Sequence, residues 1–127
     1  MKLEDQVVSL ELAMKLKELG VKQESLFSWY HYTTEDVENN IKDNWKLKMG
    51  SPSEEKTSED VSAFTVAELG ERLPFCYTTW TNVRGDDWWC GDLRGTLRPI
   101  DGATEADARA KMLIYLIELI ENNLIEL

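Results

Sequence analysis

Acidic side chains are the first candidates for chemistry, because two predicted helices each carry two glutamates three residues apart. Glu68 and Glu71 form one pair, and Glu118 and Glu121 form the other. Side chains at this spacing share a helical face, so two such pairs could hold a divalent metal ion for a hydrolase. The same spacing is typical of solvated helix faces, and no Asp or Lys constellation completes a metal site. We therefore predict no metal ion and no cofactor, and we keep a metal-dependent hydrolase as an alternative.

A stretch rich in tryptophan and arginine is the best local candidate for a binding surface. Both residue types are enriched at the energetic centres of protein interfaces, and together they can also stack a planar ligand. If Trp88 and Trp89 lie on a strand, they point to opposite faces, so one can be buried while the other meets a partner. The alternative is that both indoles only cover the two sides of a small sheet. The candidate binding residues are Trp80, Arg84, Trp88, Trp89, Arg94 and Arg98.

Cysteine and histidine offer little for catalysis. Cys76, Cys90 and His31 are the only residues of these two types, and they lack the spacing of a structural zinc site. A disulfide is possible if the cysteines face each other across a hairpin, but we expect two buried thiols in a reducing cytoplasm. His31 has no neighbouring nucleophile motif, so we expect a structural role. The dinucleotide-binding fingerprint, the P-loop and the nucleophile elbow are missing, and we predict a protein without enzymatic activity.

Charge and composition limit the classes of partner. The chain has 127 residues, a formal net charge of −10 and 5 tryptophans. This acidity argues against nucleic acid as a partner, because affinity for phosphate backbones comes largely from clustered Lys and Arg. No apolar run reaches the roughly 18 residues of a membrane span, and the N-terminus lacks the basic start and apolar core of a signal peptide. We therefore expect a cytoplasmic protein that does not contact a membrane.

The elements that position these residues follow from periodicity and from end signals. Residues 9–20 predict an amphipathic helix with Ser9 as its N-cap and Gly20 after its last turn. Aromatic content predicts a strand over 25–32, and the alternation of apolar and charged residues predicts another over 45–49. Residues 50–60 are polar and predict a mobile surface loop.

The second half of the chain predicts two more helices around a group of strands. Thr65 and Glu68 match a capping box, and the helix that they begin should end before Pro74. Residues 75–99 predict two or three short strands joined by turns, and the last helix runs from Thr104 to about Asn122. The whole chain, 1–127, is predicted as a single α+β domain: three helices packed on a small antiparallel sheet, in the order α-β-β-α-β-β(-β)-α.

The last predicted helix has a wider apolar surface than one small sheet covers. Met112, Leu116 and Leu119 widen its main apolar stripe. Either this helix is the central core element, or part of it also meets a second copy of the chain in a homodimer. Both alternatives stay open, with these three residues as candidate contacts of the dimer.

Residues 12–30 also fit the apolar skeleton of a helix–turn–helix DNA-binding unit, with its turn at Gly20 and Val21. The segment after this turn is aromatic and strand-like, and Lys22 is the only basic residue near its start, whereas a DNA reader carries several phosphate-binding cations. A DNA-binding regulator is therefore an alternative. It fails if residues 25–32 form a strand that is paired within a sheet.

Three stretches together resemble a group of small uncharacterised proteins from bacterial genomes and their phages or prophages. They are VVSLELAMKLKELGVKQESLFSWY at 7–30, AFTVAELGERLP at 63–74 and TEADARAKMLIYLIE at 104–118, about 50 residues in the same order. The group brings no known activity, cofactor or catalytic residue. The resemblance implies a cytoplasmic, prophage-associated origin and an accessory role. Our leading hypothesis is a small binding protein with an unknown protein partner.

Overall fold

The protein is described by a computed structural model, which covers residues 2–35, 41–53, 59–74, 76–82, 84–95 and 97–122. Its elements confirm the predicted α+β class. In chain order they are α1 (Leu3–Gln6), α2 (Leu10–Glu18), β1 (Phe27–Glu35), β2 (Ile41–Met49), β3 (Val61–Ser62), α3 (Val66–Arg72), β4 (Tyr77–Thr81), β5 (Trp88–Asp92), β6 (Ile100–Gly102) and α4 (Glu105–Glu121). Within the described ranges, no helix has the length and apolar character needed to cross a membrane.

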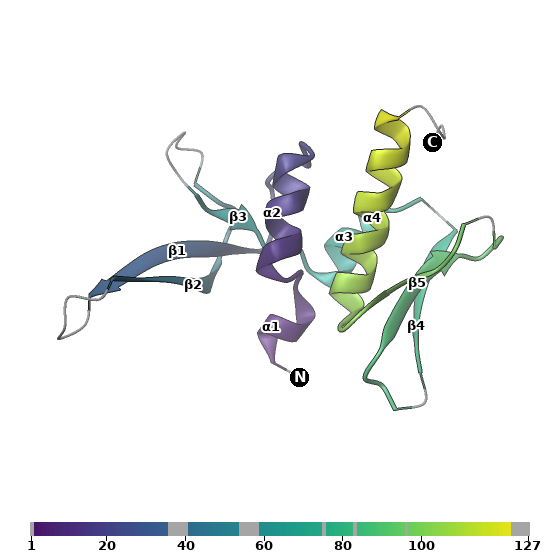
Figure 1. Cartoon of the computed structure of the whole chain (residues 1–127), viewed down its shortest axis with the longest axis horizontal. Helices are drawn as coiled ribbons and strands as arrows, with labels where there is room; N and C mark the ends of the chain where they lie inside the picture. The colour runs from purple at the N-terminus through teal and green to yellow at the C-terminus, as the bar shows by residue number, and fades with distance from the viewer. Residues whose placement is uncertain are drawn as a thin grey trace.

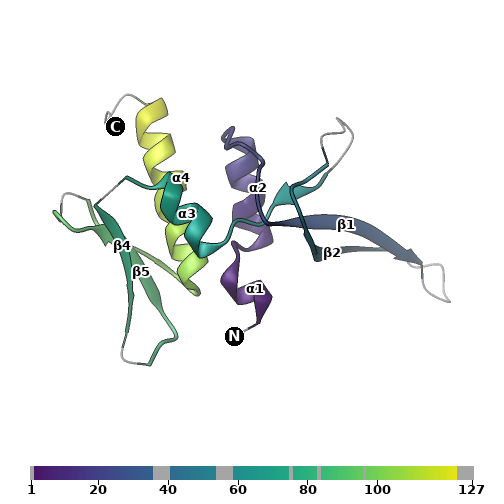
Figure 2. The same ribbon diagram turned by 180° about the vertical axis from the view of Figure 1, so that it is seen from behind.

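The strands form two antiparallel sheets instead of the one small sheet that we expected. The first sheet has the order β2-β1-β3, and the second has the order β4-β5-β6. Helices α2 and α4 lie side by side between the two sheets, and the β1–β2 hairpin extends away from them as an arm (Figures 1 and 2). Helices α3 and α4 contact each other between the two hairpins, which keeps the hairpins from sharing an edge.

The wide apolar surface of α4 is covered within the chain. This helix packs on α2, on α3 and on all three strands of the second sheet. Met112 and Leu116 are 0% and 1% exposed. They therefore cannot form a contact between folded copies, and this part of the predicted dimer interface is wrong. Leu119 is half-buried, so it alone of the three reaches the surface.

Hydrogen bonds at the helix ends explain where the helices begin. Thr65 and Glu68 form the predicted capping box at the start of α3. The hydroxyl of Thr104 accepts a hydrogen bond from the backbone N–H of Asp107 at the start of α4. Ser9 occupies the N-cap position of α2, but its side chain makes no capping bond. Its backbone N–H donates instead to Oδ1 of Asp107 at 2.8 Å, which ties the start of α2 to the start of α4.

The segment after Gly20 forms a strand and not a recognition helix. β1 pairs with β2 along its whole length and with β3 at Ser28 and Trp29. The helix–turn–helix interpretation of residues 12–30 is therefore wrong, because the aromatic side chains of this segment alternate between the two faces of a sheet. The predicted loop at 50–60 lies partly outside the described residues, at 54–58. Its described end at Glu59 and Asp60 contacts the first sheet.

Candidate functional site

The register of the second sheet sorts its side chains onto two faces. β4 pairs with β5 from Tyr77–Asp92 to Thr81–Trp88, and β5 pairs with β6 from Trp88–Gly102 to Cys90–Ile100. Paired residues lie on the same face, and successive residues alternate. The inner face, toward α4, carries Thr79, Trp88 and Cys90, and the outer face carries Thr78, Trp80, Trp89, Gly91 and Asp101.

The two adjacent tryptophans of β5 lie on opposite faces of the sheet. Trp88 packs against the buried core from the inner face. Trp89 lies on the outer face and is half-buried. Helices α3 and α4 both lie on the inner side of this sheet in the two opposite views (Figures 1 and 2). Of the two indoles, that of Trp89 is therefore on the side that none of the described helices covers.

Trp80 is the most exposed aromatic side chain of the second sheet. It lies directly opposite Trp89 in the register and is 42% exposed. Its indole rests over Gly91, where an added Cβ would lie 2.8 Å from Cη2 of Trp80 and 3.5 Å from Cβ of Pro99. Because Gly91 has no side chain, the indole of Trp80 can pack directly on the backbone at this position, beside Pro99. Trp80, Trp89, Gly91 and Pro99 form one surface, which we call the tryptophan face.

The predicted arginines are not gathered at the tryptophan face. Arg84 lies in the turn before β5, and Arg94 lies in the turn after it. Because a strand rises about 3.3 Å per residue, the two ends of this five-residue strand are roughly 13 Å apart. Nε of Arg94 lies 3.4 Å from Oδ1 of the buried Asp92. Only Arg98, which is exposed and directly precedes Pro99, adjoins the tryptophan face.

Sequence reasoning missed two residues of this surface, Gly91 and Pro99. A glycine within a strand often marks the close approach of another group, so Gly91 carried a usable signal. Pro99 carried none, because its place beside Trp80 depends on how the chain returns from β5 to β6.

Cys76 and Cys90 are both free thiols, but only Cys90 is buried as expected, and Cys76 is half-buried. Cys90 is fully buried on the inner face, and this burial raises the pKa of its thiol to about 11. Cys76 lies just before β4, where its carbonyl accepts a hydrogen bond from the backbone N–H of Leu93 at 2.8 Å. In the register, Cys90 instead lies opposite Thr79, so the two cysteines are not cross-strand partners.

The paired glutamates do not converge on a metal site. The carboxylate of Glu68 belongs to the capping box and also accepts from the backbone N–H of Leu26 at 3.2 Å. The carboxylate of Glu118 lies 4.0 Å from Nζ of Lys15. Over the ranges that the structure describes, which include all four glutamates, no three His, Cys, Asp or Glu side chains are placed to hold a metal ion. The geometry that the hydrolase alternative requires is therefore not formed.

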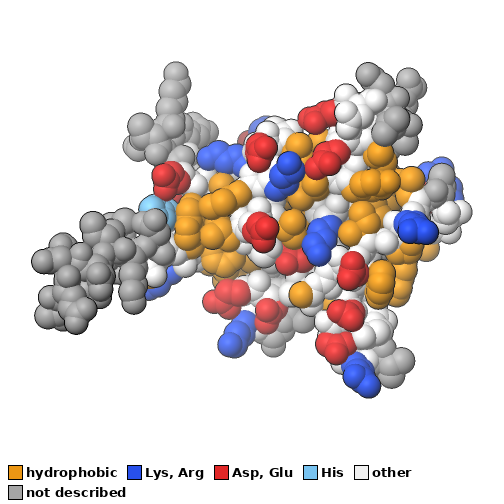
Figure 3. All heavy atoms as spheres, viewed as in Figure 1, with side chains coloured by type: hydrophobic (Ala, Val, Ile, Leu, Met, Phe, Trp, Pro, Cys, Tyr) orange, Lys and Arg blue, Asp and Glu red, His pale blue; other side chains and the backbone are white. Residues whose placement is uncertain are grey.

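His31 lies midway along β1, opposite Trp45 of β2. Its Nδ1 is 2.8 Å from Oε2 of Glu59, and its ring lies 4.9 Å from that of Trp45. Hydrophobic side chains gather beside the histidine on this face of the molecule, and a second group gathers toward the second sheet (Figure 3). The contacts of His31 join the segment before β3 to the arm.

Comparisons of the chain with protein-family models, with curated proteins and with solved structures find no match. The functional argument therefore rests on the geometry of the molecule itself.

Proposed function

We propose that this chain is a small binding protein without enzymatic activity, and that it holds a partner protein on the tryptophan face. The observation that carries this proposal is Trp80, which is 42% exposed and lies beside Trp89 on a sheet face without a helix over it. A large rigid indole offers much contact area at a small cost in side-chain entropy. Such residues dominate the binding energy of many protein interfaces.

The surroundings of the tryptophan face favour an apolar or neutral segment of the partner. Asp101 lies directly opposite Trp89 on this face, and Arg98 precedes Pro99; both are exposed, and they carry opposite charges. The rest of the chain is strongly acidic, with a net charge of −10. A neutral aromatic surface on an acidic protein stays soluble and monomeric by charge repulsion elsewhere, while the apolar contact is kept for a specific partner.

Three further features are part of the proposal. The resemblance of residues 7–30, 63–74 and 104–118 to prophage-associated proteins supports a cytoplasmic accessory protein of phage origin. The separate partners of Glu68 and Glu118 count against the metal-dependent hydrolase alternative. A homodimer through α4 has only Leu119 left of its three predicted contacts, so we propose a different protein as the partner.

The test is affinity capture from the cells that naturally make this chain, with three baits: wild type, Trp80→Ala and Tyr32→Ala. Tyr32 is a half-buried aromatic residue on the outer face of the first sheet and serves as the matched control. We expect one specific partner whose recovery falls about tenfold with Trp80→Ala, the loss typical of a central interface tryptophan, and stays unchanged with Tyr32→Ala.

Circular dichroism checks that both variants are folded before the captures are compared. Since Trp80 is partly exposed, its truncation should leave the fold intact. Equal recovery with wild type and Trp80→Ala would contradict the proposal. So would an equal loss with both variants.

A further inference from the structure

A cleft of ≈ 670 Å³ opens where the first turns of α3 and α4 face α1. Its walls come from both sheets. Phe27 begins β1 of the first sheet, and Trp88 begins β5 of the second. Cavities of this size, with apolar walls and a few polar groups, are typical of sites for small ligands or single side chains. This cleft is separate from the tryptophan face, because Trp88 points to the inner side of the sheet.

The charges that line the cleft have one sign. Among the residues that the structure describes, Asp5 and Glu105 are its charged lining residues, and no described Lys, Arg or His lines it. Asp5 is exposed on α1, and its carboxylate makes no hydrogen bond or ion pair with the residues that the structure describes. A carboxylate beside an aromatic wall is the usual environment for an organic cation, which gains from both the negative charge and the ring face.

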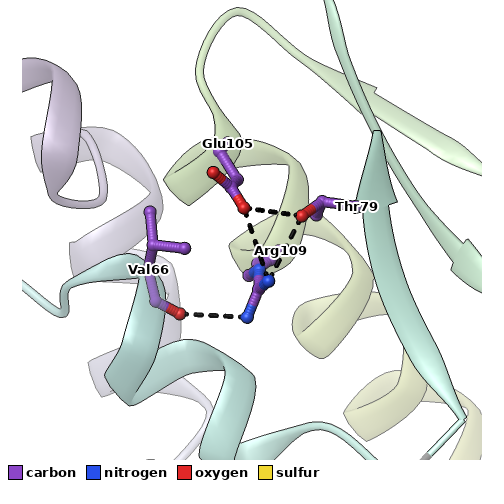
Figure 4. A network of polar contacts seen from close by, with 4 residues as sticks. All are labelled: Val66, Thr79, Glu105 and Arg109. Carbon is purple, nitrogen blue, oxygen red and sulfur yellow. Dashed lines mark hydrogen bonds and ion pairs between the residues drawn. The ribbon is translucent and has the colours of Figure 1, made fainter. Parts of the chain in front are cut away.

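Glu105 is held in place by contacts that all reach one of its two oxygens. Its Oε1 accepts from Oγ1 of Thr79 at 2.7 Å and from Nη2 of Arg109 at 3.4 Å. Arg109 is itself fixed, because its Nη1 donates to the carbonyl of Val66 at 3.2 Å (Figure 4). A Cβ at Gly70 would clash with this guanidinium, so the glycine makes room for it. Within the described part of the chain, Oε2 of Glu105 has no partner.

The N-termini of α3 and α4 at the cleft do not reverse its preference for a cation. An N-terminus alone favours an anion. The first turns here already carry Glu68, Glu105 and Asp107. The capping threonines accept the N–H groups of Glu68 and Asp107. An anion in the cleft would therefore find the N–H groups of Glu68 and Asp107 already bonded. It would also lie beside the carboxylates of Asp5 and Glu105.

We propose that this cleft binds an organic cation, namely a guanidinium or ammonium group on an apolar stem. The carboxylates of Asp5 and Glu105 hold the charged group, and the stem packs against Trp88 and Phe27. A free small amine and a basic side chain of a peptide share this chemistry. This cation site is separate from the tryptophan face, and the proposal does not depend on the partner protein that we propose there.

The test is a titration of the full chain with agmatine, an alkyl guanidinium, followed by NMR at the indole N–H of Trp88. Substitution Trp88→Phe assigns this signal. We expect a saturable shift at millimolar concentrations or below, and no shift with butylurea, which keeps a planar head group on a four-carbon stem but carries neither the guanidinium nor the ammonium charge of agmatine. Asp5→Asn should weaken agmatine binding about fivefold, the effect of one partly exposed carboxylate.

Glu4→Gln is the matched control, because it removes the same charge from the neighbouring position of α1, outside the cleft lining. Glu4→Gln and Trp80→Ala should both leave the affinity for agmatine unchanged, so failure at the tryptophan face and failure here are distinguishable. Equal weakening by Asp5→Asn and Glu4→Gln would overturn the proposal, since it would show general attraction by an acidic protein. So would the absence of a saturable shift, or a shift with succinate instead.

An acetylated, amidated tripeptide with a central arginine distinguishes the two sources of the cation. Competition with agmatine and at least tenfold tighter binding would support the proposal, with a partner's side chain as the natural occupant. Competition at equal or weaker affinity would support it with a free amine as the occupant. Binding of the peptide without displacement of agmatine, and without a shift at Trp88, would contradict a shared site.

Discussion

The outer faces of the two sheets both carry aromatic side chains, but only those of the first sheet are covered by cations of the same chain. Nζ of Lys48 lies 5.6 Å from the ring centre of Tyr30, and Nζ of Lys46 lies 5.2 Å from that of Tyr32. Lys48 also contacts Oδ2 of Asp60 at 2.6 Å. On the second sheet, no cation of the described residues lies over Trp80 or Trp89.

This difference shows that aromatic content alone does not mark a binding surface. A lysine over a tyrosine ring gains a cation–π contact and shields the ring with its alkyl stem. The tyrosine rings of the first sheet are thus already covered by lysine side chains of the same chain. The tryptophan face has a glycine and a proline beside its indoles, so its ring surface stays available to a partner.

The packing of the second sheet on α4 should be more sensitive to substitution than the packing of the first sheet on its neighbours. A Cβ at Gly102 would clash with the backbone nitrogen of Ala108, which cannot move without shifting α4. We expect Gly102→Ala to lower the free energy of unfolding by about 3 kcal/mol, the cost of forced overpacking. Urea unfolding followed by circular dichroism measures it.

Gly91→Ala is the control, because its Cβ would meet the edge of the Trp80 indole on the outer face, where the side chain can move. Its cost should stay below about 1 kcal/mol. Equal costs for the two substitutions would show that the close approach of β6 to α4 is not the sensitive contact.

The burial of Cys90 on the inner face of the second sheet should appear as a pH dependence of stability. The pKa of Cys90 is raised from 9.0 to about 11, because burial disfavours the thiolate. The folded state therefore keeps a proton that the unfolded state loses, so stability is full below pH 9 and falls as the pH rises from about 9 to about 11. Urea midpoints across this range measure the slope.

Cys90→Ala should flatten this slope, and Cys76→Ala, which changes the partly exposed cysteine, should keep it. Tyr77, whose pKa is also raised by burial, is present in both variants, so its own burial contributes to both slopes. An unchanged slope in Cys90→Ala would show that the inner face is open to water.

An indole hydrogen bond ties β1 to the segment between α1 and α2, and it can be removed alone. Nε1 of Trp29 donates to the carbonyl of Val8 at 2.9 Å. Trp29→Phe should cost about 1 kcal/mol in the free energy of unfolding, because the carbonyl loses its donor. Trp80→Phe should cost less than about 0.5 kcal/mol, since this indole is partly exposed. A larger loss from Trp80→Phe would mean that the tryptophan face is needed for folding.

Local signals predicted the elements well. The Thr65–Glu68 capping box, Thr104 at the start of α4 and the strand at 25–32 all follow from neighbouring residues, and the structure forms each of them. The division into two sheets was not predictable in this way, because it depends on how α3 and α4 pack between distant hairpins.

The candidate sites show the same limit. Alternation along a strand was enough to separate Trp88 from Trp89. It could not tell that Arg84 and Arg94 lie at opposite ends of β5. The cleft brings together Asp5, Phe27 and Glu105 from three separate elements, so no window of sequence contained it.

The most direct test of the central claim is hydroxyl-radical footprinting of the complex with the captured partner, read by mass spectrometry. Oxidation rates of Trp80, Tyr30 and Tyr32 are compared between the free and the bound protein. The tryptophan face predicts that binding slows oxidation of Trp80 several-fold and leaves both tyrosines at their free rates. Protection of the tyrosines, with Trp80 still oxidised at its free rate, would contradict it.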